Sequence, residues 1–265
     1  MIQEKVQILW NKNVGPGYFK IGLNCHGEYP KARPGQFVML RLCDQNEPLL
    51  SRPFSIHRLN FRNGKFQGIE ILYKVVGKFT KMLSGLKKNE FIDILGPLGR
   101  GFFIPQNIKR IFLVAGGIGV APIVFLASQL KNDEVDISQC RLFLGGKSKD
   151  DILCFNDFDQ LKIAVQLTTD DGSAGRKGLV THSLEMEMAE RPPDILYACG
   201  PQEMLKSVAV LAQKFAVKCQ VSVETIMACG MGACLGCAVE CRGASEKYLH
   251  ACYDGPVFDT NAIKL

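Results

Sequence analysis

The chain has 265 residues, of which 47% are hydrophobic and 22% charged, so it can bury a large core and does not have the composition of a disordered protein. The net charge of +6 is not gathered into a basic run, so we expect no nucleic-acid partner. The first residues lack the layout of a signal peptide, and no apolar run reaches the roughly twenty residues of a membrane span. We therefore expect a cytoplasmic location and no membrane contact.

From residue 1 to about residue 103, short β-rich segments alternate with turn signals such as Gly15-Pro16-Gly17 and Asn63-Gly64. Strands are predicted at residues 5–10, 18–25, 36–43, 52–59, 68–76 and 90–96. This spacing of turns favours a closed antiparallel β-barrel, which defines a first domain of residues 1–103. The stretch from Gly96 to Pro105 is the candidate linker to the next domain.

Residues 104–219 alternate strand segments with segments of helical spacing. Strands are predicted at residues 109–117, 140–146, 163–170 and 194–200, and helices at residues 120–131 and 202–216. Such alternation predicts an α/β domain whose parallel sheet is covered by helices on both faces. Residues 220–265 form a small third segment, which opens with a strand-like run at 220–225 and carries a cysteine-rich loop.

The predicted barrel carries side chains suited to an anionic cofactor with a heterocyclic ring. In Arg52-Pro53-Phe54-Ser55 the guanidinium can grip a phosphate, and the serine hydroxyl can bond the edge of a ring. An aromatic residue next to a cation follows in Leu72-Tyr73-Lys74. A third motif resembles a pyrophosphate seat, because it precedes a predicted helix at 79–86 whose first N–H groups are free. Its candidate residues are Gly77, Phe79 and Thr80, and a plain helix start is the alternative.

Two glycine turns follow strands of the α/β domain, at the edge where such sheets bind nucleotides. The first contains Gly116, Gly117 and Gly119. It is not a G-x-G-x-x-G motif, since Pro122 stands in place of the last glycine, but it has the same strand–turn–helix mechanics. The second is Cys199, Gly200 and Pro201, beside the expected nicotinamide position. A buried structural thiol is the alternative for the cysteine.

Four cysteines near the C-terminus, Cys229, Cys234, Cys237 and Cys252, have the spacing C-x4-C-x2-C-x14-C. This spacing is typical of a 2Fe–2S cluster of the plant-ferredoxin kind, and glycines within the loop would let backbone N–H groups face the sulfurs. Zinc sites more often pair two short knuckles. Cys241 is a bystander or a replacement ligand. A disulfide knot or a set of buried thiols is the alternative for the whole group.

Taken in order, these motifs resemble the ferredoxin reductase superfamily, and more specifically the electron-transfer subunits of class 1B dihydroorotate dehydrogenase. The matching segments are RPFS, LYKVVGKFT, GPLGRGF, GGIG, TDDGSAGRKG, CGPQEML, MACGMGAC and ACYDGPVF. The resemblance covers nearly the whole chain. It implies FAD in the barrel, NAD in the α/β domain and a 2Fe–2S cluster on the C-terminal loop. It also implies a heterotetramer with an FMN-containing dihydroorotate dehydrogenase catalytic subunit, two copies of each chain, serving pyrimidine (UMP) biosynthesis.

A chain that moves electrons between such cofactors needs no acid–base pair of its own, because flavin joins hydride chemistry to one-electron chemistry. We therefore assign no catalytic side chain. In this interpretation Arg52 grips phosphate or ribityl oxygens of the flavin, and Ser55 lies near its reactive edge. Tyr73 packs on the flavin or adenine ring, while Gly77 and Thr80 seat the pyrophosphate.

Three positions depart from the family pattern. Lys74 replaces an arginine, Phe79 a glycine, and Ile226 an arginine that often precedes the cluster. One alternative function is a flavin and iron–sulfur subunit of another NAD(P)H-linked complex, of the sulfide dehydrogenase or ferredoxin:NADP oxidoreductase type. A second is a zinc-stabilised binding module.

The nucleotide preference rests on one loop. Lys147 and Lys149 could bind the 2′-phosphate of NADP, whereas Asp150 and Asp151 would repel it. The resemblance favours NAD.

Overall fold

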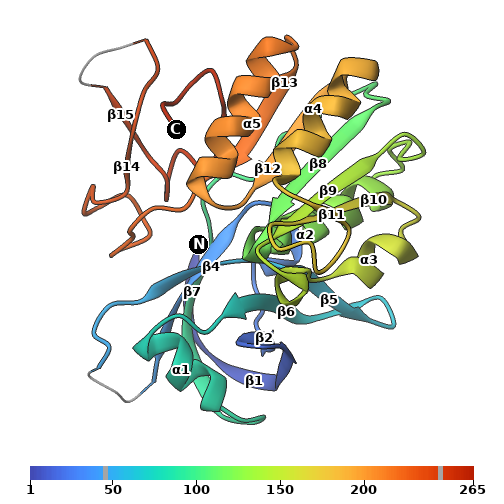
Figure 1. The fold of residues 1–265 in the computed structure, drawn as a ribbon. Coiled ribbons are helices and arrows are strands. Elements are labelled where there is room, and N and C mark those ends of the chain that lie inside the picture. The colour runs from blue at the N-terminus through green and yellow to red at the C-terminus, as the bar shows by residue number, and fades with distance from the viewer. Residues whose placement is uncertain (44–46, 244–246) are drawn as a thin grey trace.

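The computed structural model of the chain describes residues 1–43, 47–243 and 247–265. Within these residues the strands form an antiparallel sheet of seven strands, a mainly parallel sheet of seven strands and one pair of short strands (Figure 1). The antiparallel sheet occupies the lower half of Figure 1, and the parallel sheet with its helices lies above it. The predicted fold class is confirmed: an antiparallel barrel-like domain, an α/β domain and a small C-terminal segment.

The first sheet is open, not closed as we predicted. Its strands are β1 (Ile2–Gly15), β2 (Tyr18–Asn24), β3 (Phe37–Leu42), β4 (Arg52–Ser55), β5 (Arg58–Arg62), β6 (Lys65–Lys74) and β7 (Phe91–Leu98). Their order is β4-β3-β7-β1-β2-β6-β5, so β4 and β5 are the two edges of a half-barrel. The single strand predicted over residues 52–59 breaks there. The reason is that Ile56 N–H donates to Gln36 on one side, whereas His57 N–H donates to Glu70 on the other.

Helix α1 (Lys78–Gly85) closes one end of the half-barrel, where it buries Phe79 and Leu83 in the barrel core. The Asn11 side-chain amide donates to the carbonyls of Leu83 at 2.8 Å and Leu86 at 3.0 Å, which satisfies acceptors at the helix C-terminus. Strand β7 then continues through Leu98, so the first residues of the predicted linker belong to the sheet.

The second sheet is parallel, as predicted, except at one edge. Its strands are β8 (Ile111–Gly116), β9 (Arg141–Gly146), β10 (Ala164–Thr169), β11 (Arg176–Lys177), β12 (Ile195–Cys199), β13 (Lys218–Ser222) and β16 (Val257–Asp259), in the order β11-β10-β9-β8-β12-β13-β16. The helices are α2 (Val120–Asn132), α3 (Phe155–Gln160), α4 (Val180–Glu190) and α5 (Gln202–Lys214). Helices α2 and α3 bury apolar residues on one face of the sheet, and α4 and α5 do so on the other. Among the described strands of this sheet, only β16 runs antiparallel.

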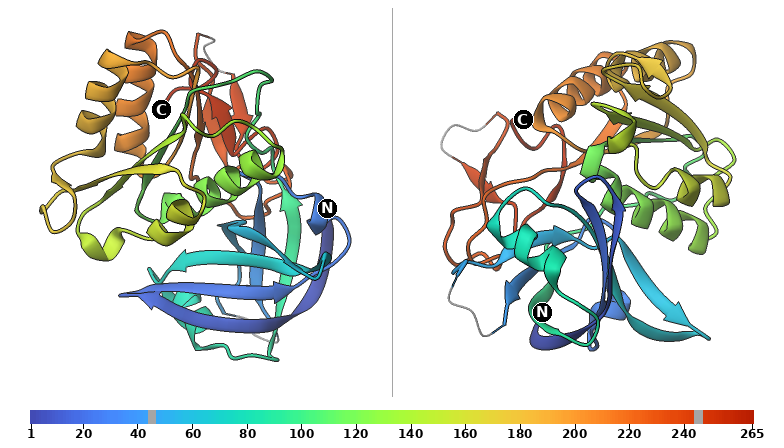
Figure 2. Two further views of the ribbon diagram at one scale, coloured as in Figure 1. Left: turned by 90° about the vertical axis from the view of Figure 1, so that its right-hand side faces the viewer. Right: turned by 60° about the horizontal axis from the view of Figure 1, so that its bottom comes forward.

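The C-terminal segment is attached to both larger parts (Figure 2). It carries the cysteine loop and a hairpin of β14 (Ala238–Glu240) and β15 (Tyr248–His250), and then returns to the second sheet as β16. The boundary predicted between residues 219 and 220 falls inside β13. Cys237 and Cys252 share one buried core with Met39 and Leu98 of the half-barrel. No helix among the described residues has the length and apolarity to cross a membrane.

Candidate metal and cofactor sites

The cysteine loop directs backbone N–H groups at sulfur atoms. The N–H groups of Met231 and Cys234 both donate to Cys229 Sγ at 3.4 Å, and that of Gly232 donates to Cys252 Sγ at 3.1 Å. Burial raises the pKa of Cys229, but the N–H groups of Met231 and Cys234, with the Cys234 thiol, outweigh it and lower the pKa to about 6. The loop backbone therefore favours a thiolate, which is the form that binds iron.

Positive φ angles give the loop its shape. Gly230 has φ of 71° and Gly232 of 85°, where glycine avoids the strain that a side chain causes. Leu235 has φ of 59° without being a glycine. Such a residue costs energy unless its surroundings hold it there, which is common at ligand-binding loops.

The arrangement of the sulfurs suits a two-iron cluster better than a zinc ion. Cys237 Sγ and Cys252 Sγ lie 3.2 Å apart. Among the described residues, however, no three of the four candidate ligands have sulfur atoms within 4.8 Å of one another. Tetrahedral zinc with bonds of about 2.3 Å would hold all four sulfurs roughly 3.8 Å apart. The residues present therefore fit a 2Fe–2S cluster, in which each iron takes two thiolates.

Cys241 lies away from this arrangement. It forms an isolated β-bridge with Ile263, and its N–H donates to the Lys247 carbonyl. No hydrogen bond of the described residues joins it to the four cysteines of the predicted ligand set.

The Cys252 thiol differs from that of Cys229, because burial and the neighbouring Cys237 thiol raise the pKa of Cys252 to about 12.

The motif Arg52 to Ser55 forms strand β4, at an edge of the half-barrel, and each of its four residues is half-buried. In the described residues β4 pairs only with β3, so its other side keeps backbone N–H and C=O groups available to a ligand. The Arg52 guanidinium donates to the carbonyls of Leu50 at 2.8 Å and Ser51 at 3.2 Å, which fixes its orientation.

The second barrel motif is divided between the interior and the surface. Leu72 and Tyr73 are buried, whereas Lys74 is exposed. The Tyr73 hydroxyl donates to Asn11 Oδ1 at 3.0 Å, and its ring stacks on Phe19 with centroids 5.7 Å apart. These contacts occupy the tyrosine within the barrel, so its stacking on a cofactor ring stays a prediction.

At the start of α1, the Thr80 hydroxyl already has partners. It accepts the N–H groups of Val76 at 2.9 Å and Gly77 at 3.1 Å. Phe79 turns inward, with its ring centroid 5.9 Å from that of Phe54. The phenylalanine that replaces a family glycine thus packs in the core, and the N–H groups left for an anion are those of the first helical turn.

The structure brings the two glycine turns of the α/β domain together, because β8 and β12 are neighbouring parallel strands. A Cβ on Gly119 would lie 2.3 Å from the Cys199 carbonyl oxygen, and one on Gly116 would lie 2.8 Å from Pro201 Cδ. A Cβ on Gly200 would lie 3.0 Å from the Gly116 nitrogen. Gly117, with φ of 52°, has open space in front of it. Three of these glycines therefore allow two turns to touch, and the fourth leaves room for a ligand.

Cys199 lies at the end of β12, within this pair of turns. Burial raises the pKa of its thiol to about 12, and the Ser222 hydroxyl only partly opposes this. The residue is thus a neutral thiol at physiological pH, suited to packing against a ligand rather than to nucleophilic attack.

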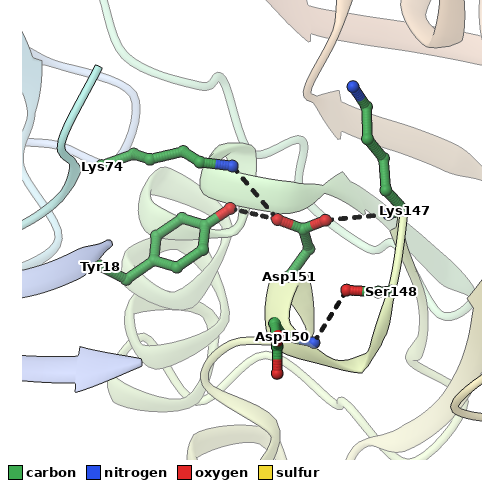
Figure 3. A network of polar contacts seen from close by, with 6 residues as sticks. All are labelled: Tyr18, Lys74, Lys147, Ser148, Asp150 and Asp151. Carbon is green, nitrogen blue, oxygen red and sulfur yellow. Dashed lines mark hydrogen bonds and ion pairs between the residues drawn. The ribbon is translucent and has the colours of Figure 1, made fainter. Parts of the chain in front are cut away.

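Asp151 links the two larger domains (Figure 3). Its carboxylate accepts the Tyr18 hydroxyl at 2.5 Å, Lys74 Nζ at 3.3 Å and the Lys147 N–H at 3.1 Å. Burial would raise the pKa of Asp151, but the bonds from Tyr18 and Lys74 lower it. Asp151 therefore faces the half-barrel, while the Lys147 side chain extends away from it in Figure 3.

A second link joins the domains through Asp157, which is bound by Arg58 at 2.5 Å and by Lys20 at 3.6 Å. Sequence reasoning missed both links. Their partners lie 77 to 137 residues apart along the chain, the widest pair being Lys20 and Asp157, and no local sequence pattern indicates such pairs.

Comparison with known proteins agrees with this organisation. Residues 5–103 match the oxidoreductase FAD-binding domain, and residues 113–210 match the oxidoreductase NAD-binding domain. Residues 224–264 match the iron–sulfur cluster binding domain of dihydroorotate dehydrogenase B. The chain thus has domains for FAD, NAD and an iron–sulfur cluster.

Individual relatives are similar over most of the chain. The electron transfer subunit of dihydroorotate dehydrogenase B (NAD(+)) from Desulforamulus reducens is 40% identical over 86% of this chain and 85% of its own. The subunit of that name from Caldanaerobacter subterraneus subsp. tengcongensis is 38% identical over 96% and 95%. Among solved structures, that of an NADH-dependent reduced ferredoxin-NADP oxidoreductase superposes with a TM-score of 0.83 at 31% identity, over 98% of this chain and 89% of the other. The chain belongs to the family of electron transfer subunits of dihydroorotate dehydrogenase B.

Proposed function

We propose that this chain transfers electrons from a dihydroorotate dehydrogenase catalytic subunit to NAD⁺. The observation that carries the proposal is the cysteine loop, whose N–H groups face its sulfurs, in a chain that also has the FAD- and NAD-binding domains. In the overall reaction dihydroorotate loses two electrons and two protons. NAD⁺ gains two electrons and one proton, and the second proton enters solvent. The pathway served is pyrimidine biosynthesis.

When bound, FAD exchanges a hydride for single electrons, and the 2Fe–2S cluster carries electrons one at a time. The residues of the chain position these groups. Arg52 would hold a phosphate or ribityl oxygen of the flavin, and Ser55 and the open side of β4 would bond the edge of its ring. The first turn of α1 would receive the pyrophosphate, with Gly77 as its N-cap.

NAD would bind at the carboxyl edge of the second sheet. There the turn of Gly116 to Gly119 presents a helix N-terminus to the pyrophosphate, and Cys199 to Pro201 border the nicotinamide. Because Asp151 is occupied by the half-barrel, only Asp150 remains in this loop to disfavour a 2′-phosphate. We retain NAD as the substrate, and the ratio of kcat/KM for NADH to that for NADPH tests this choice.

The name of the family implies a catalytic partner subunit. We propose that this partner contains FMN and forms a heterotetramer with two copies of each chain. The cysteine loop offers it an apolar surface, since Ile226, Met231, Leu235 and Tyr253 are exposed there, Ile226 at 89%. An exposed isoleucine where relatives often have arginine replaces a charged contact with an apolar one.

A second candidate is a subunit of the ferredoxin-NADP oxidoreductase type, because a solved structure of that description is similar over the whole chain. Curated relatives of higher identity favour the dihydroorotate enzyme. A direct test mixes the purified chain with an FMN-containing dihydroorotate dehydrogenase subunit and follows NAD⁺ reduction. Dihydroorotate-dependent formation of NADH supports the proposal. NADPH formation from reduced ferredoxin, without any response to dihydroorotate, contradicts it.

A further inference from the structure

Gly230, next to the first candidate ligand, lies against the half-barrel. A Cβ on this residue would be 2.5 Å from Met39 Cγ, 2.9 Å from Met39 Sδ and 3.3 Å from Leu98 Cδ1, where ordinary contact begins at 3.4 Å. A side chain at residue 230 would therefore require the loop or the buried Met39 side chain to shift. Glycine at this position lets the cysteine loop lie directly on Met39.

Met39 lies between this loop and the strand of the flavin motif. It is 1% exposed and shares a buried core with Cys237 and Cys252. Its strand β3 is hydrogen-bonded to β4, and Met39 is directly opposite Pro53. Opposite residues of an antiparallel pair have side chains on the same face of the sheet. Met39 is thus in contact with the cysteine loop and beside the residues proposed to hold flavin.

We propose that Met39 and Gly230 set the separation between the iron–sulfur cluster and the flavin and provide the packed path between them. This inference rests on the proposed function. Each electron that leaves reduced iron is gained by the flavin, and no bond to the protein forms or breaks, so both residues act by position alone. The thioether is polarizable and fills irregular gaps, which leaves no void along the path.

The experiment uses the full-length chain, purified without oxygen and with its iron, sulfide and flavin quantified. Pulsed electron paramagnetic resonance measures the magnetic coupling between the reduced cluster and one-electron-reduced flavin. Rapid mixing with NADH then gives the rate constant for electron transfer from flavin to cluster. The first reading reports separation and does not depend on turnover.

Gly230→Ala should weaken the coupling and slow the transfer severalfold. Gly64→Ala is the matched control, because Gly64 has φ of 73° against 71° for Gly230 and has nothing within 4 Å. The backbone strain is the same in the two variants, and only Gly230→Ala adds a collision. An unchanged coupling in Gly230→Ala contradicts the proposal.

Met39 variants give an independent test should Gly230→Ala fail to hold its cluster. Met39→Ala should also weaken the coupling and slow transfer, since it opens a cavity beneath the loop. Met39→Leu conserves volume and should keep both close to the original values. Met188→Ala, at a fully buried methionine of α4, controls for the loss of a core side chain.

Two failures are distinguishable. If Met39→Ala contains iron and flavin and keeps the wild-type coupling and rate constant, this inference alone is overturned. A wild-type chain without iron or flavin overturns the proposed function as well.

Discussion

Two glycine-rich turns in this molecule are held in different ways. The turn from Gly116 to Gly119 connects a buried strand to a buried helix, and Gly116 and Gly119 are required because the neighbouring turn at Cys199 touches them. The loop from Cys229 to Cys237 contains no strand or helix, and the described hydrogen bonds that its N–H groups donate run to sulfur atoms. The first turn is fixed by the packing of the protein. The second is completed by the group that its cysteines bind.

The two turns of this chain are thus held in shape by different things, the packed sheet in one case and a bound metal in the other. A turn between regular elements is stabilised by the whole sheet, so its shape survives without a ligand. A metal-binding loop obtains much of its folding free energy from the metal. Damage to the cysteine loop should therefore spare the nucleotide turn, whereas damage to the nucleotide turn should weaken the entire α/β domain.

The largest effect is expected from Cys234→Ser. Loss of this proposed ligand should remove the cluster and abolish electron transfer from the catalytic partner to the flavin. Oxidation of NADH by an artificial two-electron acceptor should remain near the wild-type rate, because it needs only the flavin and the nucleotide turn. Steady-state assays of dihydroorotate-dependent NADH formation and of NADH oxidation by the artificial acceptor measure this difference. Full activity of the complex with Cys234→Ser would show that the relay does not pass through these cysteines.

The next effect concerns the nucleotide turn itself. Gly119→Ala places a Cβ 2.3 Å from the Cys199 carbonyl, and that backbone atom cannot move aside cheaply. We expect a loss of about 3 kcal/mol in the free energy of unfolding, from denaturant titration. Gly117→Ala, where φ is 52° and the space is open, should lose only about 1 kcal/mol. Equal losses in the two variants would contradict the packing account of this turn.

Mild acid should loosen the same turn through His57. Its buried Nδ1 lies 3.1 Å from the Ala121 carbonyl, in the first turn of α2. Burial, reinforced by the charge of Lys20, lowers the pKa of His57 from 6.5 to about 3. The unfolded chain therefore binds a proton first, and stability falls as pH drops below about 6.5. The loss is roughly 1.4 kcal/mol per pH unit, or about 2 kcal/mol at pH 5.

His57→Asn tests this pH effect, because it keeps a donor for Ala121 and cannot titrate. The variant should lose less stability between pH 7 and pH 5 than the wild type. The nearby Arg58 and Asp157 are present in both proteins, so the comparison isolates residue 57. An unchanged pH slope would mean that another group titrates.

The smallest effect is expected at the link between the domains. Asp151→Asn removes the charge that accepts Lys74 and Tyr18, and should cost about 1 kcal/mol in the free energy of unfolding. It should also raise KM for NADH more than it lowers kcat, since Asp151 holds the loop at Lys147. Glu47→Gln, which breaks an exposed ion pair with Lys78, should change neither quantity. Identical behaviour of the two variants would remove Asp151 from this role.

Much of the fold could be predicted from the sequence, because its patterns are local. Turn signals predicted the strands of the half-barrel, and alternating strands and helices predicted the parallel sheet. The spacing Val180, Leu184 and Met188 could have indicated α4, which we missed. The open edge of the half-barrel could not be predicted, since it depends on hydrogen bonds of Ile56 and His57 to different strands.

The candidate sites divide in the same way. The cysteine spacing and the glycine turns were visible as motifs. The roles of Asp151 and Met39 were not, because each depends on contacts with residues far away in the chain. Tyr73 is a case in which the motif was visible but the contacts of the side chain were not. Its place in a motif predicted a ring that packs on the flavin or adenine, but the motif did not indicate that the residue is buried and bonded to Asn11.

The most direct test of the central claim is elemental and flavin analysis of the chain purified without oxygen. We expect two irons, two acid-labile sulfides and one FAD per chain, without zinc. Zinc in place of iron, or a preparation with neither iron nor flavin after anaerobic purification, would contradict it.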